Sequence, residues 1–390
     1  MNLLTVGAGM YVTGRDNTGT GTILASILET SKTHPIEEVL IVSRSERGYA
    51  DVEEASRRLN GTLGTEVSVR YQQLEAGRNH AHFNELLATG TYDACIISTP
   101  DATHFAYAKI AMQRACPTLV VKPLVPTLAE NEELVRLQDE HETYGAVEFH
   151  KRWDDTNLFI RRQLAAGAYG DPLYMVVEYS QRISIPTETF ASWIGTTNIF
   201  QYLGVHYVDM AYFLTGYQPQ RLTAYGTRGG LQARGIDAYD SVHVNIVWQH
   251  PDDPTREFWT TYNTNWVDPE TTTAMSDQKY FLVGTGGRIE CDQKHRGLEE
   301  TVHGQPPRSV NPYFSDFLPD DRGGLRFDGY GHRSVRAFLT DVLDLRAGRV
   351  TVTELEKIRP TFRSSLVSSA VVEAVNDSLA NQAAWTAVNL

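Results

Sequence analysis

The chain begins with an apolar run, a glycine turn and an amphipathic segment: residues 3–28 read LLTVGAGMYVTGRDNTGTGTILASIL. The run Leu3–Val6 predicts a buried strand, and the apolar positions within Ile23–Leu28 predict one face of a helix. A strand, a glycine turn and a helix in this order let backbone N–H groups approach a pyrophosphate at the start of the helix. The stretch therefore predicts the first strand and helix of a nucleotide-binding sheet.

The glycine turn departs from the usual dinucleotide fingerprint. Gly7 and Gly9 supply its first two glycines, but Val12 takes the place of the third, and the loop continues through an extended stretch from Met10 to Thr20. We predict cofactor contacts at Gly7, Gly9 and Met10. A plain turn between a strand and a helix is the alternative.

Short apolar runs alternate with helical patterns as far as about residue 150. The expected strands are Val39–Val42, Val67–Tyr71, Ala94–Ile97, Thr118–Val121 and Gly145–Phe149, and the expected helices are His82–Leu87, Phe105–Met112 and Leu128–Glu140. This alternation is typical of a doubly wound parallel sheet. We predict an α/β protein with a Rossmann domain in residues 1–150.

Beyond residue 150 the pattern changes to long strands of alternating polarity, as at Val242, Val244 and Ile246. The other expected elements are strands Tyr174–Tyr179, Arg221–Tyr225, Glu257–Asn263 and Tyr280–Val283, helices Thr156–Ala166, Ile199–Leu214, Ser334–Arg346 and Thr353–Asn376, and a surface loop Pro306–Gly331. We predict an α+β domain in residues 151–390, with a large, mainly antiparallel open sheet for substrate binding and oligomerisation. Its C-terminal helices are candidates to pack back on the Rossmann domain.

The composition favours a protein that acts on small molecules. The 390 residues hold 35 Lys plus Arg against 48 Asp plus Glu, a net charge of −13 without a dense basic run, so neither a nucleic-acid partner nor a membrane partner is expected. No apolar run of about 18 residues and no basic leader occur, so we expect a cytoplasmic protein. Cys95, Cys116 and Cys291 form no CxxC pair, so we expect neither a disulfide framework nor a metal site.

Polar residues follow three of the expected strands, at the sheet edge where ligands of such folds bind. Ser43 and Arg44 stand where an NAD-preferring fold usually has an acidic residue, so they favour NADP over NAD, because an arginine neutralises a 2′-phosphate. Thr99, Pro100 and His104 follow the next buried strand, and Lys122 follows the one after it. We predict cofactor contacts at all six, with an exposed basic residue as the alternative for Arg44.

Several motifs together resemble the glucose-fructose oxidoreductase and inositol dehydrogenase family, Gfo/Idh/MocA. They are the glycine turn, Thr99–His104, Lys122-Pro123, Gly204–Asp209, Phe149–Trp153, Gly284–Gly287 and Val335–Phe338. The resemblance spans most of the chain and rests on the order and spacing of these motifs. It implies a Rossmann domain, a second α/β domain whose open sheet commonly makes the oligomer, and oxidation or reduction of a sugar, inositol or related polyol.

The resemblance also implies a reaction centre. Lys122 matches the lysine of the Glu-Lys-Pro motif, which hydrogen-bonds the reacting hydroxyl; His206 matches the usual general acid/base, and Asp209 the acidic residue that commonly follows it. Removing a hydride from a carbinol carbon also requires loss of the O–H proton, which an imidazole accepts near neutral pH. The structural alternatives are a solvated lysine and a hydrogen-bonded helix histidine.

Two positions depart from the family pattern. The Glu of Glu-Lys-Pro is Val121 here, and the Asp expected four residues before the histidine is Tyr202, one helical turn from His206. Loss of that Asp removes a charge that would raise the pKa of the histidine. The phenol of Tyr202 is a candidate for proton relay, and a packed core aromatic is its alternative.

Substrate contacts are predicted at Arg152, Trp193, Asn198 and Asp209, with Arg182 nearby, and surface charge or core packing is the alternative for each. The leading function is an NAD(P)-dependent oxidoreductase acting on a sugar, aminosugar, nucleotide-sugar or cyclitol. Two alternatives remain: a redox-neutral enzyme that retains and recycles its nicotinamide, and a non-catalytic binding protein of the same fold. We expect a homodimer or homotetramer.

Overall fold

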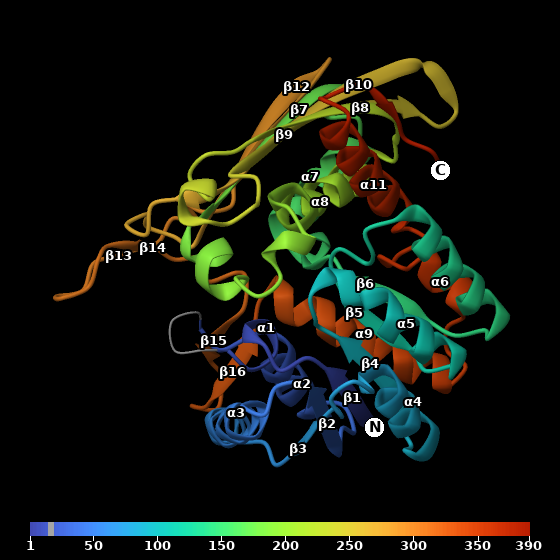
Figure 1. The fold of residues 1–390 in the computed structure, drawn as a ribbon, viewed down its shortest axis with the longest axis vertical. Coiled ribbons are helices and arrows are strands. Elements are labelled where there is room, and N and C mark those ends of the chain that lie inside the picture. The colour runs from blue at the N-terminus through green and yellow to red at the C-terminus, as the bar shows by residue number, and fades with distance from the viewer. Residues whose placement is uncertain (15–18) are drawn as a thin grey trace. The chain divides into compact units, whose positions relative to one another are not determined.

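A computed structural model describes residues 1–14 and 19–390 (Figure 1). The chain forms two compact units. The first comprises Met1–Val125, Ala129–Asp154 and Tyr313–Ser365, and the second comprises Pro126–Leu128, Asp155–Pro312 and Leu366–Leu390. Each unit is thus built from separate segments of the chain. The predicted division into residues 1–150 and 151–390 would leave residues 313–365 outside the first unit.

The first unit contains a sheet of six parallel strands in the order β3-β2-β1-β4-β5-β6, which confirms the predicted Rossmann sheet. The strands are β1 Asn2–Val6, β2 Glu38–Ser43, β3 Ser68–Gln73, β4 Ala94–Ile97, β5 Thr118–Val121 and β6 Gly145–Glu148. Val6 pairs with Val42 on one side and with Ile97 on the other, so the carboxyl ends of β1, β2 and β4 lie at one edge.

Helices cover this sheet. They are α1 Met10–Thr13, α2 Ile23–Ser31, α3 Gly48–Leu63, α4 Asn79–Thr89, α5 His104–Gln113, α6 Leu128–Glu140, α9 Tyr330–Arg346 and α10 Val352–Glu356, with short turns η1 Asp101–Thr103 and η2 His150–Trp153. Ile23, Leu24, Ile27 and Leu28 of α2 are fully buried, and burial of each such side chain contributes about 1.5–3 kcal/mol to folding. Helix α9 packs against α2 although about 300 residues separate them.

The structure corrects four expectations about helices, strands and loops. Helix α3 follows β2, where no helix was predicted. Residues 10–13 form α1 rather than extended chain, and residues 15–18 of the expected Met10–Thr20 stretch lie outside the described residues. The expected loop 306–331 contains β14 Arg308–Ser309 and a hairpin, β15 Asp316–Pro319 with β16 Leu325–Asp328.

The fourth correction concerns the expected helix Thr353–Asn376, which is two helices, α10 and α11 Leu366–Ala380. The chain between them pairs with the edge of β6: the Val147 N–H donates to the Pro360 carbonyl over 2.7 Å, and the Phe362 N–H donates to Gly145. Because Pro360 cannot continue a regular helix and its carbonyl completes the sheet edge, the helix is interrupted here.

The second unit is built on a seven-stranded mixed sheet in the order β12-β11-β7-β10-β9-β8-β17. Its strands are β7 Pro172–Arg182, β8 Gln218–Thr227, β9 Ser241–His250, β10 Asp253–Asp268, β11 Ser276–Gly284, β12 Gly287–Asp292 and β17 Thr386–Ala387, and β13 Glu299–Glu300 pairs with β14 outside the sheet. Only β7 and β10 are parallel neighbours, which confirms the mainly antiparallel sheet.

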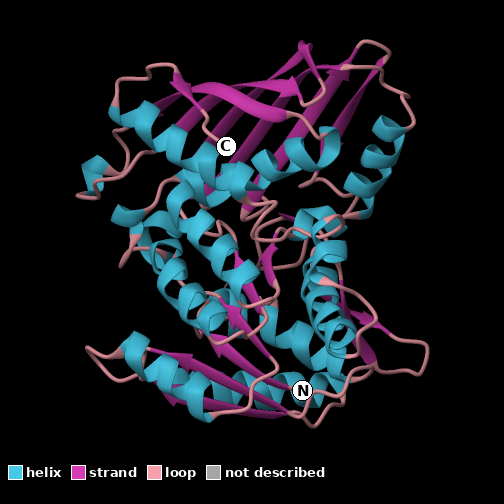
Figure 2. Ribbon diagram, turned by 90° about the vertical axis from the view of Figure 1, so that its right-hand side faces the viewer, coloured by secondary structure: helices cyan, strands magenta, loops and turns pink. Residues whose placement is uncertain are grey.

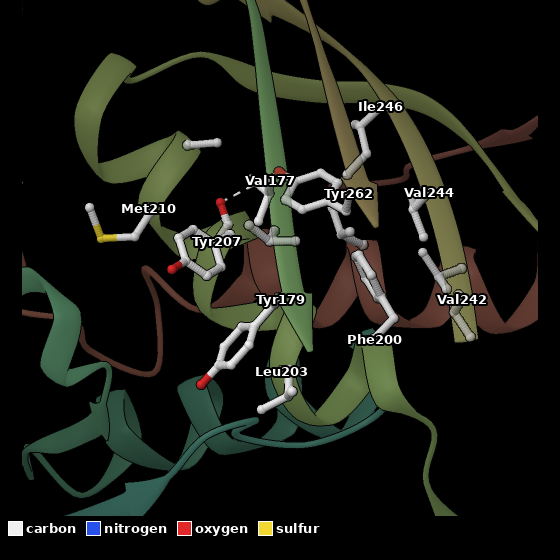
Figure 3. Close-up of a cluster of buried hydrophobic side chains, with 14 of the residues drawn as sticks. Val177, Tyr179, Phe200, Leu203, Tyr207, Met210, Val242, Val244, Ile246 and Tyr262 are labelled. Carbon is white, nitrogen blue, oxygen red and sulfur yellow. Dashed lines mark hydrogen bonds between the residues drawn. The ribbon is translucent and has the colours of Figure 1, made fainter. Parts of the chain in front are cut away.

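Helices of this unit lie along one face of the sheet, as Figure 2 shows. They are α7 Asp155–Ala165, α8 Val205–Thr215 and α11, with short helices η3 Ile185–Thr189, η4 Ile194–Thr196, η5 Phe200–Gly204 and η6 Gln232–Arg234. Figure 3 shows the core between them, where Val242, Val244 and Ile246 of β9 face Phe200 of η5. The opposite face carries the exposed aromatic residues Tyr174, Tyr225, Trp259 and Phe281.

Candidate active site

The glycine turn after β1 leaves no room for a side chain at its first position. Gly7 has a φ of +106°, and a Cβ built there would lie 1.9 Å from the carbonyl oxygen of Ser98, at the end of β4. Gly9 differs, because a Cβ there would meet no atom within 4 Å. The backbone at Gly9, which precedes α1, is therefore open to a ligand, while Val12 in place of the third glycine is fully buried.

The end of β2 presents Arg44 to solvent. The hydroxyl of Ser43 is bonded to that of Tyr71 over 2.7 Å, and the Gln73 side chain donates to the Arg44 carbonyl. Burial raises the pKa of Tyr107, and the positive charge of Arg44 opposes that rise, so the guanidinium lies within electrostatic range of the phenol. Of the two residues predicted to read a 2′-phosphate, Arg44 is the exposed one.

His104 ties two loops together inside the first unit. Its imidazole is 1% exposed, with Nδ1 lying 2.8 Å from the Pro123 carbonyl and Nε2 lying 2.7 Å from the Thr99 carbonyl. The loop after β4 is thereby held to the loop after β5. The ring nitrogens of His104 are engaged with the backbone rather than directed at a ligand, and the Thr99 hydroxyl accepts a hydrogen bond from Thr103.

Lys122 stands at the carboxyl end of β5, between β4 and β6 in the sheet. Burial lowers the pKa of Lys122 to about 7, and the negative charges of Glu148 and Asp101 oppose that shift. A lysine in this state exchanges a proton near neutral pH. A lysine ammonium can stabilise a developing alkoxide, and this role of Lys122 stays a prediction.

Buried polar residues beside Lys122 were missed by sequence reasoning. Glu148, 1% exposed at the end of β6, is hydrogen-bonded to Ser334 and His150, and Tyr11 lies next to His150. The available signal was a carboxylate inside an apolar strand, Gly145–Phe149, which needs a partner when buried.

His206 and Asp209 lie one turn apart on α8 in the second unit, each 3% exposed. Tyr207, the residue directly after His206, anchors the start of this helix. Its hydroxyl donates to Gln293 over 2.6 Å, and its carbonyl accepts from the buried Tyr262 hydroxyl, the contact dashed in Figure 3. The α8 backbone that carries His206 is therefore fixed against the sheet.

Tyr202 and Trp193 meet on a third aromatic ring. Phe190 lies 4.2 Å from the ring centre of Trp193 and 4.7 Å, edge to face, from that of Tyr202. Tyr202 belongs to η5, a π-helical turn directly before α8, and such turns are frequent at functional sites. Packing thus accounts for the ring of Tyr202, whereas the role of its hydroxyl stays a prediction.

Asn198 and Arg182, two of the residues expected to border the substrate site, are hydrogen-bonded within the second unit. The side-chain oxygen of Asn198 accepts from the Gln201 N–H, and its amide donates to Asn376 over 2.8 Å. Arg182 donates to the carbonyl of Thr272. Arg152 is a buried residue of η2 in the first unit.

None of the helices in residues 1–14 and 19–390 is long and apolar enough to cross a bilayer. Over the same residues, no three His, Cys, Asp or Glu side chains are grouped so as to hold a metal ion.

Comparison with protein families gives two matches of one family. Residues 49–149 match the oxidoreductase family with an NAD-binding Rossmann fold, and residues 158–290 match the GFO/IDH/MocA C-terminal domain. The first match contains Lys122, and the second contains His206.

Individual relatives are more distant. The chain is 29% identical over 133 residues to scyllo-inositol 2-dehydrogenase (NADP(+)) of Bacillus subtilis, covering 33% of this chain and 36% of the relative. It is 24% identical over 224 residues to D-apiose dehydrogenase of Rhizobium rhizogenes, covering 57% and 62%. The matched parts thus span about a third to three fifths of these curated relatives.

Solved structures agree over the whole fold. The scyllo-inositol dehydrogenase of Lactobacillus casei, with bound NAD(H) and scyllo-inositol, has a TM-score of 0.67 at 13% identity, covering 99% of this chain and 98% of that one. A putative myo-inositol dehydrogenase of Sinorhizobium meliloti has a TM-score of 0.64 at 16% identity, covering 100% and 99%. At these identities the likeness establishes the fold.

Proposed function

The chain belongs to the GFO/IDH/MocA oxidoreductase family, and we propose that it transfers a hydride between NAD(P) and a carbinol carbon of a sugar, aminosugar, nucleotide-sugar or cyclitol. The observation that carries the proposal is Lys122, whose pKa is lowered to about 7 at the carboxyl end of a Rossmann strand. The crowding at Gly7 and the open backbone at Gly9 fit a dinucleotide. A nicotinamide held there supplies the acceptor or donor of the hydride.

The protein groups manage the proton and the charge on oxygen. In the oxidation direction, Lys122 donates a hydrogen bond to the reacting hydroxyl and stabilises its developing negative charge. His206 takes the hydroxyl proton as general base, and in the reduction direction it returns that proton. Arg152, Trp193, Asn198 and Asp209 remain proposed substrate contacts, and the hydrogen bonds of Asn198 to Asn376 and to the Gln201 N–H hold its side chain in place.

The test is a panel of sugars, cyclitols and their phosphorylated or nucleotide-linked forms, each mixed with the purified protein and NADP⁺ or NAD⁺. An increase in the absorbance of reduced nicotinamide with one substrate class supports the proposed dehydrogenase activity. Nicotinamide that copurifies and is not exchanged during turnover indicates the self-recycling enzyme instead. Absence of binding to either cofactor contradicts both enzymatic functions.

We expect Arg44→Ala to weaken NADP⁺ binding by roughly tenfold to a hundredfold and NAD⁺ binding much less, because a charge-assisted contact to phosphate contributes about 1.5–3 kcal/mol. Fluorescence titration with NADPH and NADH measures both. Arg47→Ala, on the same exposed segment, is the matched control. Equal weakening of both cofactors, or a wild type that prefers NAD⁺, would show that Arg44 does not read a 2′-phosphate.

We expect a homodimer or homotetramer, because Tyr174, Tyr225, Trp259 and Phe281 stay exposed on one face of the second sheet. Light scattering should return a multiple of the 43.7 kDa chain mass at micromolar concentration. The double variant Tyr225→Glu with Trp259→Glu should shift the distribution towards the single chain. A wild type that is monomeric at this concentration contradicts the expectation.

We also propose that the protein is located in the cytoplasm. Cys95, Cys116 and Cys291 are all buried, and burial raises the pKa of Cys116 to about 12, which keeps it as an unreactive thiol. Such thiols are compatible with the reducing cytoplasm that we propose as its location.

A further inference from the structure

We propose that Tyr11 is a positioning residue for the glycine turn Gly7–Gly9, and that the buried residues His150 and Glu148 hold Tyr11 in place. We call the contacts among Tyr11, His150, Glu148 and Ser334 the Tyr11 brace. The part that the turn plays in binding a dinucleotide rests on the proposed function. The brace itself lies entirely within the first unit.

Helix α1, which follows the turn, is too short to be stable on its own. It has four residues and ends at Gly14, whose φ is +79°. Isolated helices shorter than about 12–15 residues are marginal in water, so contacts outside α1 must hold it. The usual third glycine lets the helix pack closely on the sheet, but here Val12 stands at that position and is fully buried.

Tyr11 connects α1 to two other elements. Its carbonyl accepts from the Thr22 N–H over 2.8 Å, at the residue before α2. Its partly buried ring packs against the apolar core of the first unit, and its hydroxyl lies 3.3 Å from Nδ1 of His150 in η2. Tyr11 is therefore held at its backbone, at its ring and at its hydroxyl.

His150 is fixed by a carboxylate and two aromatic rings. Its Nδ1 lies 2.9 Å from Oε2 of Glu148. Because an ionised carboxylate only accepts, Nδ1 carries the proton, and the Tyr11 oxygen is a second, longer acceptor of the same N–H. The ring of Tyr330 stacks on the imidazole with 5.6 Å between centres, and Phe314 meets it edge-on at 5.2 Å.

Glu148 is fixed in turn by a third element. The Ser334 hydroxyl, near the start of α9, donates to its Oε1 over 2.6 Å. Glu148 is 1% exposed, and a buried carboxylate is costly unless hydrogen bonds compensate for the water it has lost. The hydroxyl of Tyr11 is therefore held by a chain of buried side chains that ends in α9.

The brace acts on the part of the turn that is open to a ligand. A Cβ built at Gly9 would meet no atom within 4 Å. The Gly9 carbonyl accepts from the N–H groups of Val12 and Thr13 over 2.9 and 3.1 Å, so any rotation of α1 moves the Gly9 backbone with it. By holding α1, Tyr11 sets in advance the orientation of the backbone that we propose to bind the pyrophosphate.

The experiment compares the full-length wild type with Tyr11→Phe, which removes one hydroxyl and keeps the ring. Hydrogen exchange of the peptide that covers Gly7–Gly14, without ligand, measures the order of the turn, and fluorescence titration with NADPH and NADH measures affinity. We expect exchange to become about twofold to tenfold faster and the affinity to fall by a similar factor, the usual effect of one hydrogen bond. Tyr92→Phe, at a partly buried tyrosine before the amino end of β4, is the matched control and should change neither.

Variants of His150 separate positioning from packing. His150→Ala should weaken cofactor binding at least as much as Tyr11→Phe. His150→Asn should restore most of the affinity, because its amide can donate to Glu148 and Tyr11 from a place close to that of Nδ1. An affinity that follows the melting temperature across the variants and is not restored by His150→Asn overturns the proposal. If His150→Ala fails to fold, Tyr11→Phe decides.

Exchange and affinity that both stay unchanged in Tyr11→Phe also overturn the proposal, and so does faster exchange with unchanged affinity. Weaker affinity with unchanged exchange does the same, since the hydroxyl would then contact the ligand directly. Because binding is measured without substrate, a protein that binds nicotinamide but transfers no hydride refutes the proposed function and still tests the brace. If the wild type binds neither cofactor, the proposed function is contradicted, and the exchange of Gly7–Gly14 alone supports or overturns the brace.

Discussion

His206→Ala should lower kcat by about 10²–10⁴-fold, the usual contribution of a positioned general base, and leave the affinity for NADP(H) nearly unchanged. We expect the rate and the cofactor affinity to respond differently because the residues belong to different units. His206 is a buried residue of α8 in the second unit, whereas the glycine turn and Arg44, which are proposed to bind the cofactor, belong to the first. Steady-state rates on a substrate found in the panel, with fluorescence titration of NADPH, measure both quantities.

Tyr202→Phe is the matched comparison for that variant. It removes one hydroxyl and keeps the ring that packs edge to face on Phe190. A loss comparable to that of His206→Ala would place the phenol in the proton relay, and near-normal rates would leave His206 working without it. Full activity in His206→Ala would refute its assignment as the base.

Lys122→Met should be at least as damaging as loss of the histidine, because it removes the group that stabilises the alkoxide. The wild-type rate should also depend on pH in a defined direction. With the pKa of Lys122 at about 7, the ammonium form is present below that pH and is lost above it. Steps that need the hydrogen-bonding ammonium should therefore slow as pH rises through 7, and this limb should be missing from the Lys122→Met profile.

The melting temperature of Lys122→Met should be measured alongside its rate, and a second lysine variant serves as the control. The substitution keeps the apolar stem but removes a positive charge near Glu148 and Asp101, so a lower melting temperature is expected alongside the lost rate. Lys109→Met, at a partly exposed position of α5, should change neither quantity. If Lys122→Met kept both its rate and its pH profile, the lysine would have no part in the reaction.

Local sequence patterns predicted most of the first unit. The bounds of β4, β5 and α6 were predicted to the residue, because each is a continuous apolar or amphipathic run. Helix α3 was missed although Val52, Ala55, Leu59 and Leu63 line its buried face at helical spacing. The helix has a low overall hydrophobicity, so the prediction overlooked the helical spacing of these four apolar residues.

Other features depend on contacts between distant segments and could not be read locally. The hairpin of β15 and β16 is held by α2, where Glu29 accepts from the Phe327 N–H. In the same way, the sequence identified Lys122 as a candidate but could not identify Glu148 as its neighbour. That relation depends on β5 and β6 being adjacent in register, which is a property of the folded sheet.

The late return of the chain to the first unit has a consequence for its synthesis. Helix α9 covers α2, and the segment around Pro360 covers the edge of β6, yet both leave the ribosome after strands β7 to β12 of the second sheet. Until then, a nascent nucleotide-binding half carries an uncovered apolar surface and a strand with unpaired backbone groups, which are the features that recruit other chains. A gene fragment ending near residue 150 should therefore yield an aggregating product rather than a free-standing cofactor-binding module.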